Sequence, residues 1–214
     1  MYDFLEPINI ASLSNDKGYS NEQYGNHISA YEDEIPDLAA ADIVIAGVNE
    51  YRGEGINIKG QAAEAIRSEL YQLHFWHSDI KIADIGNIKT GATIADSYSA
   101  IKTILIELLN MNKTVVLLGG SHDIMLAQYY AFKQLGRQAE ATVIDSKIDL
   151  TGSSSLPSEN FLMEMLTTEP NFIKHYNHIG FQSYLVHPHM LETMHKLRFD
   201  CYRVAVAKEN IEEM

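Results

Sequence analysis

From residue 42 onward, short apolar runs typical of strands alternate with longer segments in which apolar residues recur at helical spacing. This alternation predicts strands and helices in turn. Short runs rich in β-branched residues predict six strands, at 42–47, 80–88, 114–120, 141–145, 178–184 and 199–206. Apolar positions at helical spacing predict helices at 60–75, 94–112, 122–136 and 187–198, and a short one near 159–167. Asp96 is a candidate cap for the second helix, and Gly136 is placed to end the third.

Strands that alternate with helices predict an α/β fold in three layers, a mostly parallel sheet with helices on both faces. Residues 1–40 are polar and irregular, and we expect them to precede a domain that spans 41–214. Residues 207–214 begin like a helix and stop without a cap, so we expect this domain to be incomplete at its C-terminus.

The composition and net charge of the chain limit the kinds of molecule that we expect it to bind. The 214 residues are 46% apolar, enough for one sizeable core. A net charge of -13 argues against binding to nucleic acid or to an anionic membrane surface. Cys201 is the only cysteine, so no disulfide forms within the chain. Together with the absence of a signal peptide, this favours a cytoplasmic protein. No apolar run has the length that a membrane span needs.

Two strand ends carry candidate chemistry. In "GGSHD", His122 follows a glycine pair that allows a sharp turn. In "VIDSKID", Asp145, Lys147 and Asp149 would project to one side if the backbone stayed extended. Both motifs lie at the carboxyl ends of predicted strands, where parallel sheets bind ligands. One imidazole and two carboxylates suit a cation such as Mn²⁺.

These two motifs resemble the ureohydrolase superfamily, which contains arginases, agmatinases and formimidoylglutamases. The segments "IAGVNEYRGEGINIKGQAAEAIRSELY", "ADIGNI" and "NHIGFQSY" are similar to other parts of it, so the resemblance covers roughly residues 40–206. It is closest to the formimidoylglutamase and arginase-like branch. The resemblance implies His122, Asp145 and Asp149 as metal ligands, a centre of two Mn ions, a small-molecule amidine substrate and a homo-oligomer.

Three departures from the family pattern argue against a working centre. Lys147 stands where the family has a metal-binding histidine, and an ammonium has no lone pair to offer. Lys147 could instead bridge Asp145 and Asp149, or bind as an amine if desolvation lowered its pKa. The family's Asp-x-Asp segment is missing, since only Asp200 follows residue 184. The loop "TGSSSLPSENF" also lacks the proton-shuttling histidine of the arginases.

The resemblance therefore implies a Mn-dependent hydrolase of C–N bonds in guanidino or formimino compounds, although we expect the chain as given to be inactive. The alternatives are a metal-free family member that acts as a scaffold, and a module that binds small molecules without turnover. Asp123 reads as a first-turn acid favoured by the helix dipole rather than as a ligand.

Other segments suggest rival sites. "HYNH" (His175, His178) and "HPH" (His187, His189) have spacings that can chelate zinc, but no cysteine or carboxylate supports them. Surface or helix-start positions explain these histidines better. "GEGINIKG" lacks the spacing of a phosphate-binding loop, so we interpret it as the first loop of the family fold.

Overall fold

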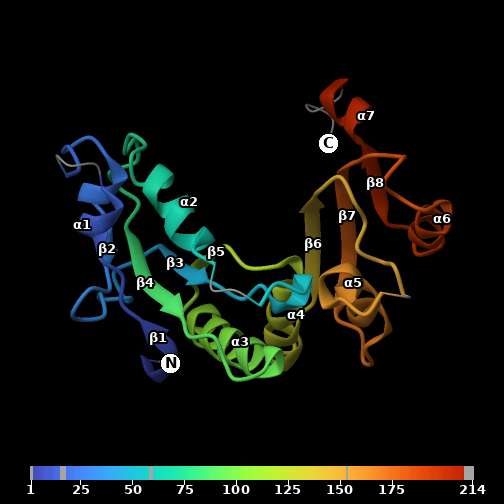
Figure 1. Ribbon diagram of the computed structural model, residues 1–214, viewed down its shortest axis with the longest axis horizontal. Helices are drawn as coiled ribbons and strands as arrows, with labels where there is room; N and C mark the ends of the chain where they lie inside the picture. The colour runs from blue at the N-terminus through green and yellow to red at the C-terminus, as the bar shows by residue number, and fades with distance from the viewer. Residues whose placement is uncertain (1, 15–17, 58–59, 153, 210–214) are drawn as a thin grey trace. The chain divides into compact units, whose positions relative to one another are not determined.

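The computed structural model describes residues 2–14, 18–57, 60–152 and 154–209, which form two compact units (Figure 1). Unit 1 comprises residues 1–131 and unit 2 residues 132–214. The division falls inside α4 (Met125–Gln134). Among the described residues, no helix combines the length and the hydropathy that crossing a bilayer would need.

Unit 1 is built on a five-stranded, mostly parallel sheet. Its strands are β1 (Leu5–Glu6), β2 (Ser29–Ala30), β3 (Ile43–Val48), β4 (Ile82–Ile88) and β5 (Thr114–Leu118). The order is β1-β4-β3-β5, and β2 also pairs with β4. Strand β3 runs parallel to both β4 and β5, while the short β1 is antiparallel to β4. The carboxyl ends of the three main strands therefore share one edge of the sheet.

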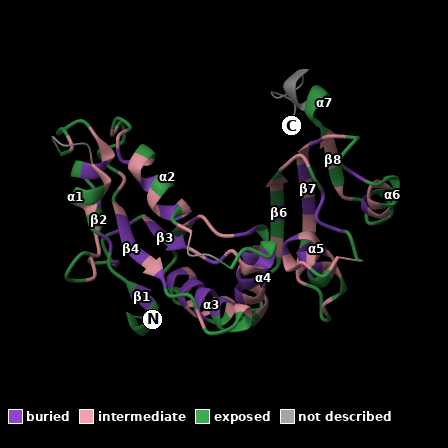
Figure 2. Cartoon of the chain, in the orientation of Figure 1, coloured by how far each residue is buried: buried purple, intermediate pink, exposed green. Residues whose placement is uncertain are grey.

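Helices cover both faces of this sheet, as the alternation predicts. Val44 and Ala46 of β3 pack in one core with α3 (Ile94–Asn110), while Ile45 packs in a second core with α2 (Ala62–Leu70). Neighbouring residues of a strand point to opposite faces, so this division follows from the pleat. Strands β3 and β4 are accordingly buried along almost their whole length (Figure 2).

The start of α3 differs in detail from the prediction. Thr93 is the N-cap residue, and its hydroxyl accepts a hydrogen bond from the Asp96 backbone. The Asp96 carboxylate in turn accepts from the Thr93 backbone N–H at 2.9 Å, which completes a capping box. Asp96 thus supports the cap from the third helical position rather than serving as the cap itself.

A buried ion pair joins α2 to the sheet of unit 1. The Arg67 guanidinium donates to both carboxylate oxygens of Asp84, at 2.7 and 2.9 Å, and neither side chain is exposed. Arg67 also donates to the Gly86 carbonyl at 2.9 Å and to the Asn87 side chain at 2.7 Å. The Tyr71 hydroxyl donates to the same carboxylate of Asp84. Besides each other, the two charges that have left water thus have three further partners, Gly86, Asn87 and Tyr71.

Unit 2 is a parallel three-stranded sheet with helices. Its strands are β6 (Ala139–Ile144), β7 (Ile173–Phe181) and β8 (Asp200–Arg203), in that order. Its helices are α5 (Pro157–Thr167), α6 (Pro188–Lys196) and α7 (Val204–Glu209). The α5 side chains Phe161, Leu162 and Met165 are buried, as are Tyr176 of β7 and Met194 of α6.

The remaining short elements are η1 (Tyr2–Phe4), α1 (Ile10–Leu13), η2 (Tyr24–Asn26), η3 (Arg52–Glu54) and η4 (His122–Ile124). The strand predicted at 199–206 is shorter than expected, because the chain turns into α7 at Val204. Of the predicted start of a helix at 207–214, residues 210–214 lie outside the described residues. Gly136 follows α4 with φ at 65°, a conformation typical of a helix end.

We expect Arg67→Met to lower the free energy of unfolding by about 3–5 kcal/mol, because it leaves the Asp84 carboxylate buried without a counter-charge. Urea denaturation measures this loss. Adding Asp84→Asn should restore part of it, since no charge then remains buried. Lys174→Met removes the exposed pair with Glu140 and should leave the urea midpoint almost unchanged. A wild-type midpoint for Arg67→Met would contradict the assigned role.

Burial raises the pKa of the Cys201 thiol to about 11, and the Asp200 carboxylate adds to the shift. Only the thiolate is alkylated, so at pH 8 about 0.1% of the folded chain would be reactive, against roughly a quarter of the unfolded chain. We expect the rate with iodoacetamide to rise about tenfold per pH unit up to pH 10. A native rate that levels off near pH 9, as it should in urea, would contradict this pKa.

Candidate metal centre

The turn that carries His122 lies at the carboxyl end of β5 in unit 1. Gly119 and Gly120 both have φ at 84°, a backbone conformation that side chains with a Cβ rarely adopt. The next residue, Ser121, donates from its backbone N–H to the Glu50 carbonyl at 2.8 Å. The turn is therefore tied to the loop that follows β3, and it leaves the imidazole of His122 exposed.

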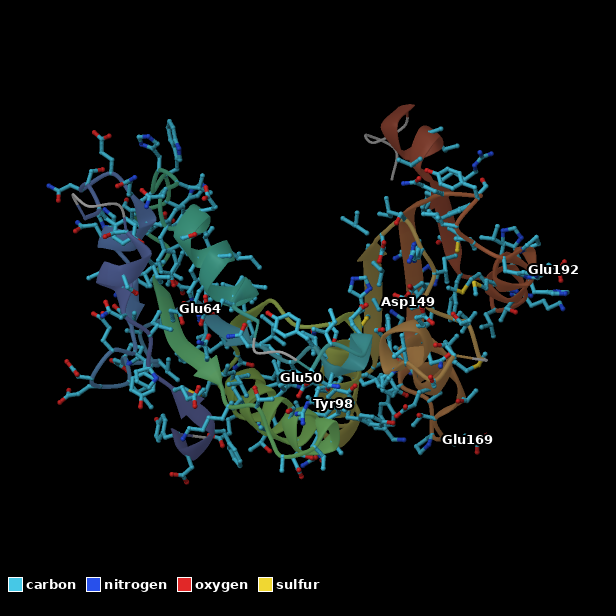
Figure 3. All side chains as sticks on the ribbon, viewed as in Figure 1. Glu50, Glu64, Tyr98, Asp149, Glu169 and Glu192 are labelled. Carbon is cyan, nitrogen blue, oxygen red and sulfur yellow. The ribbon has the colours of Figure 1, made fainter. Side chains whose placement is uncertain are left out.

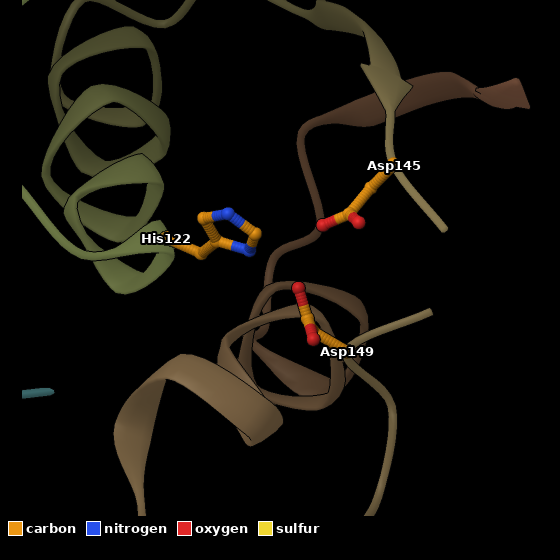
Figure 4. Close-up of side chains that lie close together, drawn as sticks. All are labelled: His122, Asp145 and Asp149. Atoms are coloured by element: carbon orange, nitrogen blue, oxygen red, sulfur yellow. The ribbon is translucent and has the colours of Figure 1, made fainter. Parts of the chain in front are cut away.

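In unit 2, Asp145 and Asp149 lie close together after the end of β6. A carboxylate oxygen of one lies within 4.8 Å of a carboxylate oxygen of the other. Figure 4 shows both carboxylates, and it also shows the imidazole of His122 in unit 1. Asp149 is buried and Asp145 is half-buried. Two carboxylates at this separation in a partly desolvated place favour a cation between them.

The backbone between Asp145 and Asp149 is not extended. The prediction that the two side chains come together by projecting from one side of an extended segment is therefore wrong. Strand β6 ends at Ile144, and the Asp145 carboxylate accepts hydrogen bonds from the backbone N–H groups of Ser146 and Lys147. The segment therefore bends, and Lys147 does not share one side of a strand with the aspartates.

The Lys147 side chain is exposed, and within the described chain it forms no ion pair. The predicted bridge from Lys147 to Asp145 and Asp149 is thus not present there. A solvated ammonium opposes a nearby cation far less than a buried one would, because water screens its charge.

A buried histidine supports the loop that carries Asp145. The Nε2 of His178 lies 3.0 Å from the Asp145 carbonyl oxygen, and its Nδ1 lies 3.1 Å from the Tyr176 hydroxyl. Burial lowers the pKa of His178 against the opposing influence of that carbonyl. The neutral ring donates from Nε2 and accepts at Nδ1. His178 is therefore a structural support rather than a zinc ligand.

Local contacts also explain the other three histidines of the segments that suggested zinc sites. His175 pairs with Asp200 at 2.9 Å, and His189 pairs with Glu192 at 3.1 Å. His187 is the N-cap residue of α6, the helix-start position that its sequence context favoured. Among the described residues, neither these three histidines nor His178 belongs to a cluster with the ligand spacing of a metal site.

The loop after β3 contains polar residues that the sequence did not single out. The buried Glu50 carboxylate accepts hydrogen bonds from Arg52, at 2.9 Å from Nε, and from the Ser97 hydroxyl at 2.6 Å. Burial raises the pKa of Glu50, but these bonds outweigh it and hold the pKa below its ordinary value. A cavity of about 160 Å³ lies beside them, lined also by Asn57 and Thr90.

Asp123 is an acid in the first turn of η4, as the sequence predicted, but its burial was not predicted. It is fully buried in η4, and one of its oxygens accepts a hydrogen bond from the Tyr98 hydroxyl of α3. No periodicity signals this burial, because it depends on a tyrosine that is distant in sequence. Figure 3 labels Tyr98 and Glu50.

Comparison with known proteins places these features in a family. A profile described as Arginase family matches residues 41–213, whereas no curated protein sequence matches the chain. The structure of formimidoylglutamase from Bacillus subtilis subsp. subtilis str. 168 aligns with a TM-score of 0.73 at 16% identity. The alignment covers 91% of this chain and 65% of that one.

Two further solved structures share the fold. Trypanosoma cruzi formiminoglutamase, solved with Mn²⁺, aligns with a TM-score of 0.67 at 17% identity, over 82% of this chain and 67% of that one. A hypothetical agmatinase from Burkholderia thailandensis aligns at 0.64 and 17% identity, over 84% and 59%. The chain thus spans about three fifths to two thirds of these relatives.

We expect His178→Leu to lower the free energy of unfolding by about 1–3 kcal/mol, because it leaves the Asp145 carbonyl and the Tyr176 hydroxyl buried without this partner. Urea denaturation measures the loss. His178→Gln retains a side-chain N–H and should lose less, while the partly exposed His175→Ala serves as the control. Equal losses for the leucine and glutamine variants would show that His178 acts by its volume alone.

Proposed function

Because the chain belongs to the Arginase family, we propose that it binds a divalent cation, of which Mn²⁺ fits best, through His122, Asp145 and Asp149. The observation that carries the proposal is the pair of carboxylates of Asp145 and Asp149, whose oxygens lie within 4.8 Å. We include His122 because the family resemblance implies it as a ligand of the same metal centre as Asp145 and Asp149. The activity that we propose for the chain is the hydrolysis of C–N bonds in linear amidines.

The donor set fits such an ion. Carboxylate oxygens and a neutral imidazole are ligands that Mn²⁺ accepts, and all three residues can offer a lone pair. The backbone donors of Ser146 and Lys147 orient the Asp145 carboxylate, and His178 holds the carbonyl of the same residue. This support keeps one ligand in place without requiring the ion.

When bound, the ion would lower the pKa of a water molecule and would stabilise the negative charge that develops when this water attacks. Water adds to the amidine carbon, the bond from this carbon to the substituted nitrogen breaks, and the amine leaves with a proton. A formimino substrate yields formamide and an amine, and a guanidino substrate yields urea and an amine. The carboxylates of Asp145 and Asp149 would hold the ion, with the imidazole of His122 as the third proposed ligand.

Lys147 favours a second candidate function. It occupies the position of a family metal ligand and carries a positive charge on the same loop as both aspartates. A metal-free family member that binds a small molecule or acts as a scaffold would need no lone pair there. The two candidates differ in one measurable property, the affinity for Mn²⁺.

We expect Lys147→His to raise the affinity for Mn²⁺ at least tenfold, because the change removes a positive charge and adds a lone pair. Isothermal titration calorimetry of the chelator-treated protein measures both affinities. Lys147→Ala separates the two causes, since it removes the charge without adding a ligand. Lys196→His, on the exposed side of α6, adds an imidazole elsewhere and serves as the matched control.

The same titration decides between the candidates. Asp145→Asn and Asp149→Asn should each abolish binding if the wild type binds through these carboxylates. If neither the wild type nor Lys147→His binds Mn²⁺, the metal proposal fails and the metal-free candidate replaces it. Release of formamide or urea from formimino and guanidino compounds then tests turnover in every variant that binds the ion.

A further inference from the structure

A cavity of about 200 Å³ lies at the amino ends of β3 and β4 in unit 1. These are the strand ends opposite to the arrowheads in Figure 1, whereas the His122 turn lies at the carboxyl edge of the same sheet. Ala41, Ile82 and Ala83 give the cavity apolar surface. Its volume is smaller than that of pockets for drug-sized molecules, so it suits a small metabolite.

Two opposite charges line this cavity, those of Lys81 and Asp37. Both side chains are exposed, and in the described part of the chain neither forms an ion pair. Asp37 Oδ1 accepts a hydrogen bond from the Ala39 backbone N–H at 2.9 Å, which leaves Oδ2 available. The hydroxyls of Ser29 and Ser78 line the same cavity and can donate or accept. An anionic and a cationic partner are thus both open to a ligand.

The backbone around these charges is held in place without a ligand. The Lys81 N–H donates to the Asp42 carboxylate at 2.8 Å, and the Lys81 carbonyl accepts from the Asp42 N–H at 2.8 Å. Lys113 Nζ donates to the carbonyls of Ala39 and Ala41, at 3.1 and 2.6 Å. These bonds fix the segment that leads into β3. A preformed site of this kind lowers the entropy cost of binding.

One wall of the cavity is aromatic. His27 and Phe75 stack with ring centroids 4.3 Å apart and planes 18° apart, and His27 Nε2 donates to the Asn21 carbonyl at 2.6 Å. Both rings also line a second cavity, of about 460 Å³, together with Trp76, which is 83% exposed. Aromatic surface that continues from one cavity to the next favours a planar apolar group.

We propose that this cavity binds a free α-amino acid with an aromatic side chain. The ligand's carboxylate meets the Lys81 ammonium, its ammonium meets the Asp37 carboxylate, and its ring packs against Phe75 and His27. Asp37 repels a simple anion and Lys81 repels a simple cation, so a zwitterion is the class that satisfies both. The inference does not depend on the proposed hydrolysis, because it involves none of the proposed metal ligands.

The test is isothermal titration calorimetry of the full chain with L-phenylalanine, in chelator so that no metal contributes. We expect saturable binding. Phenethylamine lacks the carboxylate and 3-phenylpropionate lacks the ammonium, so each should bind the wild type at least about tenfold more weakly than L-phenylalanine does.

Matched variants assign the two charges. Lys81→Met and Asp37→Asn should each weaken binding of L-phenylalanine about tenfold, because each removes one charge-assisted contact. Lys81→Met should bind phenethylamine at least as tightly as the wild type does, since that probe has no carboxylate to lose. Lys89→Met makes the same change just beyond the other end of β4 and should bind L-phenylalanine like the wild type. All three side chains are exposed, and an unchanged urea midpoint shows that each variant folds.

Three results would overturn the proposal. The first is no saturable binding of L-phenylalanine by the wild type at millimolar concentration. The second is equal affinity for L-phenylalanine and either singly charged probe, which would mean that the aromatic wall alone binds. The third is equal affinity of Lys81→Met and Lys89→Met for L-phenylalanine. None of these results bears on Mn²⁺ binding, so failure here leaves the proposed function standing.

Discussion

The salt bridge between Arg67 and Asp84 is the interaction on which the rest of unit 1 depends. Both side chains are fully buried, so each charge has lost its hydration and must find a partner inside the protein. The planar guanidinium meets both carboxylate oxygens and still has donors left for the Gly86 carbonyl and the Asn87 side chain. These bonds determine where α2 sits against β4, since a shift of the helix would break several of them at once.

From this salt bridge, polar contacts extend to the loop at the carboxyl end of β3. Asn87 donates to Glu64 of α2, and Glu64 also accepts from Asn49 at 3.2 Å. Asn49 accepts from the Tyr51 hydroxyl at 3.1 Å, and this hydroxyl accepts from the backbone of Ala62 at 3.0 Å. The loop that holds the His122 turn through Glu50 is therefore positioned by hydrogen bonds that begin at a buried charge. A loop held in this way can present polar groups without an apolar core of its own.

The sequence predicts some of these features and not others, and the difference has a physical reason. Apolar periodicity depends on local burial, so it located β3, β4, β5 and the helices between them to within a few residues. The same pattern cannot show that Arg67 lies on the buried side of α2, because arginine is rarely buried unless a partner is present. The partner, Asp84, lies in another element. The burial of Asp123 could not be predicted for the same reason, since it depends on Tyr98 in another element. The strand predicted at 199–206 was wrong beyond Arg203, where apolar residues continue into a helix.

The candidate centre shows that the depth of a charge matters as much as its sign. Lys147 is the residue that most opposes a metal in the sequence, yet its exposed ammonium faces water and counter-ions that reduce its influence. Asp123, which the sequence marks only as a first-turn acid, is by contrast fully buried, and a charge at such a depth would be screened far less. Lys147 at a predicted ligand position is therefore not by itself a sufficient argument against the proposed cation site. The balance depends on which charges the fold removes from water, and this is a property of tertiary packing.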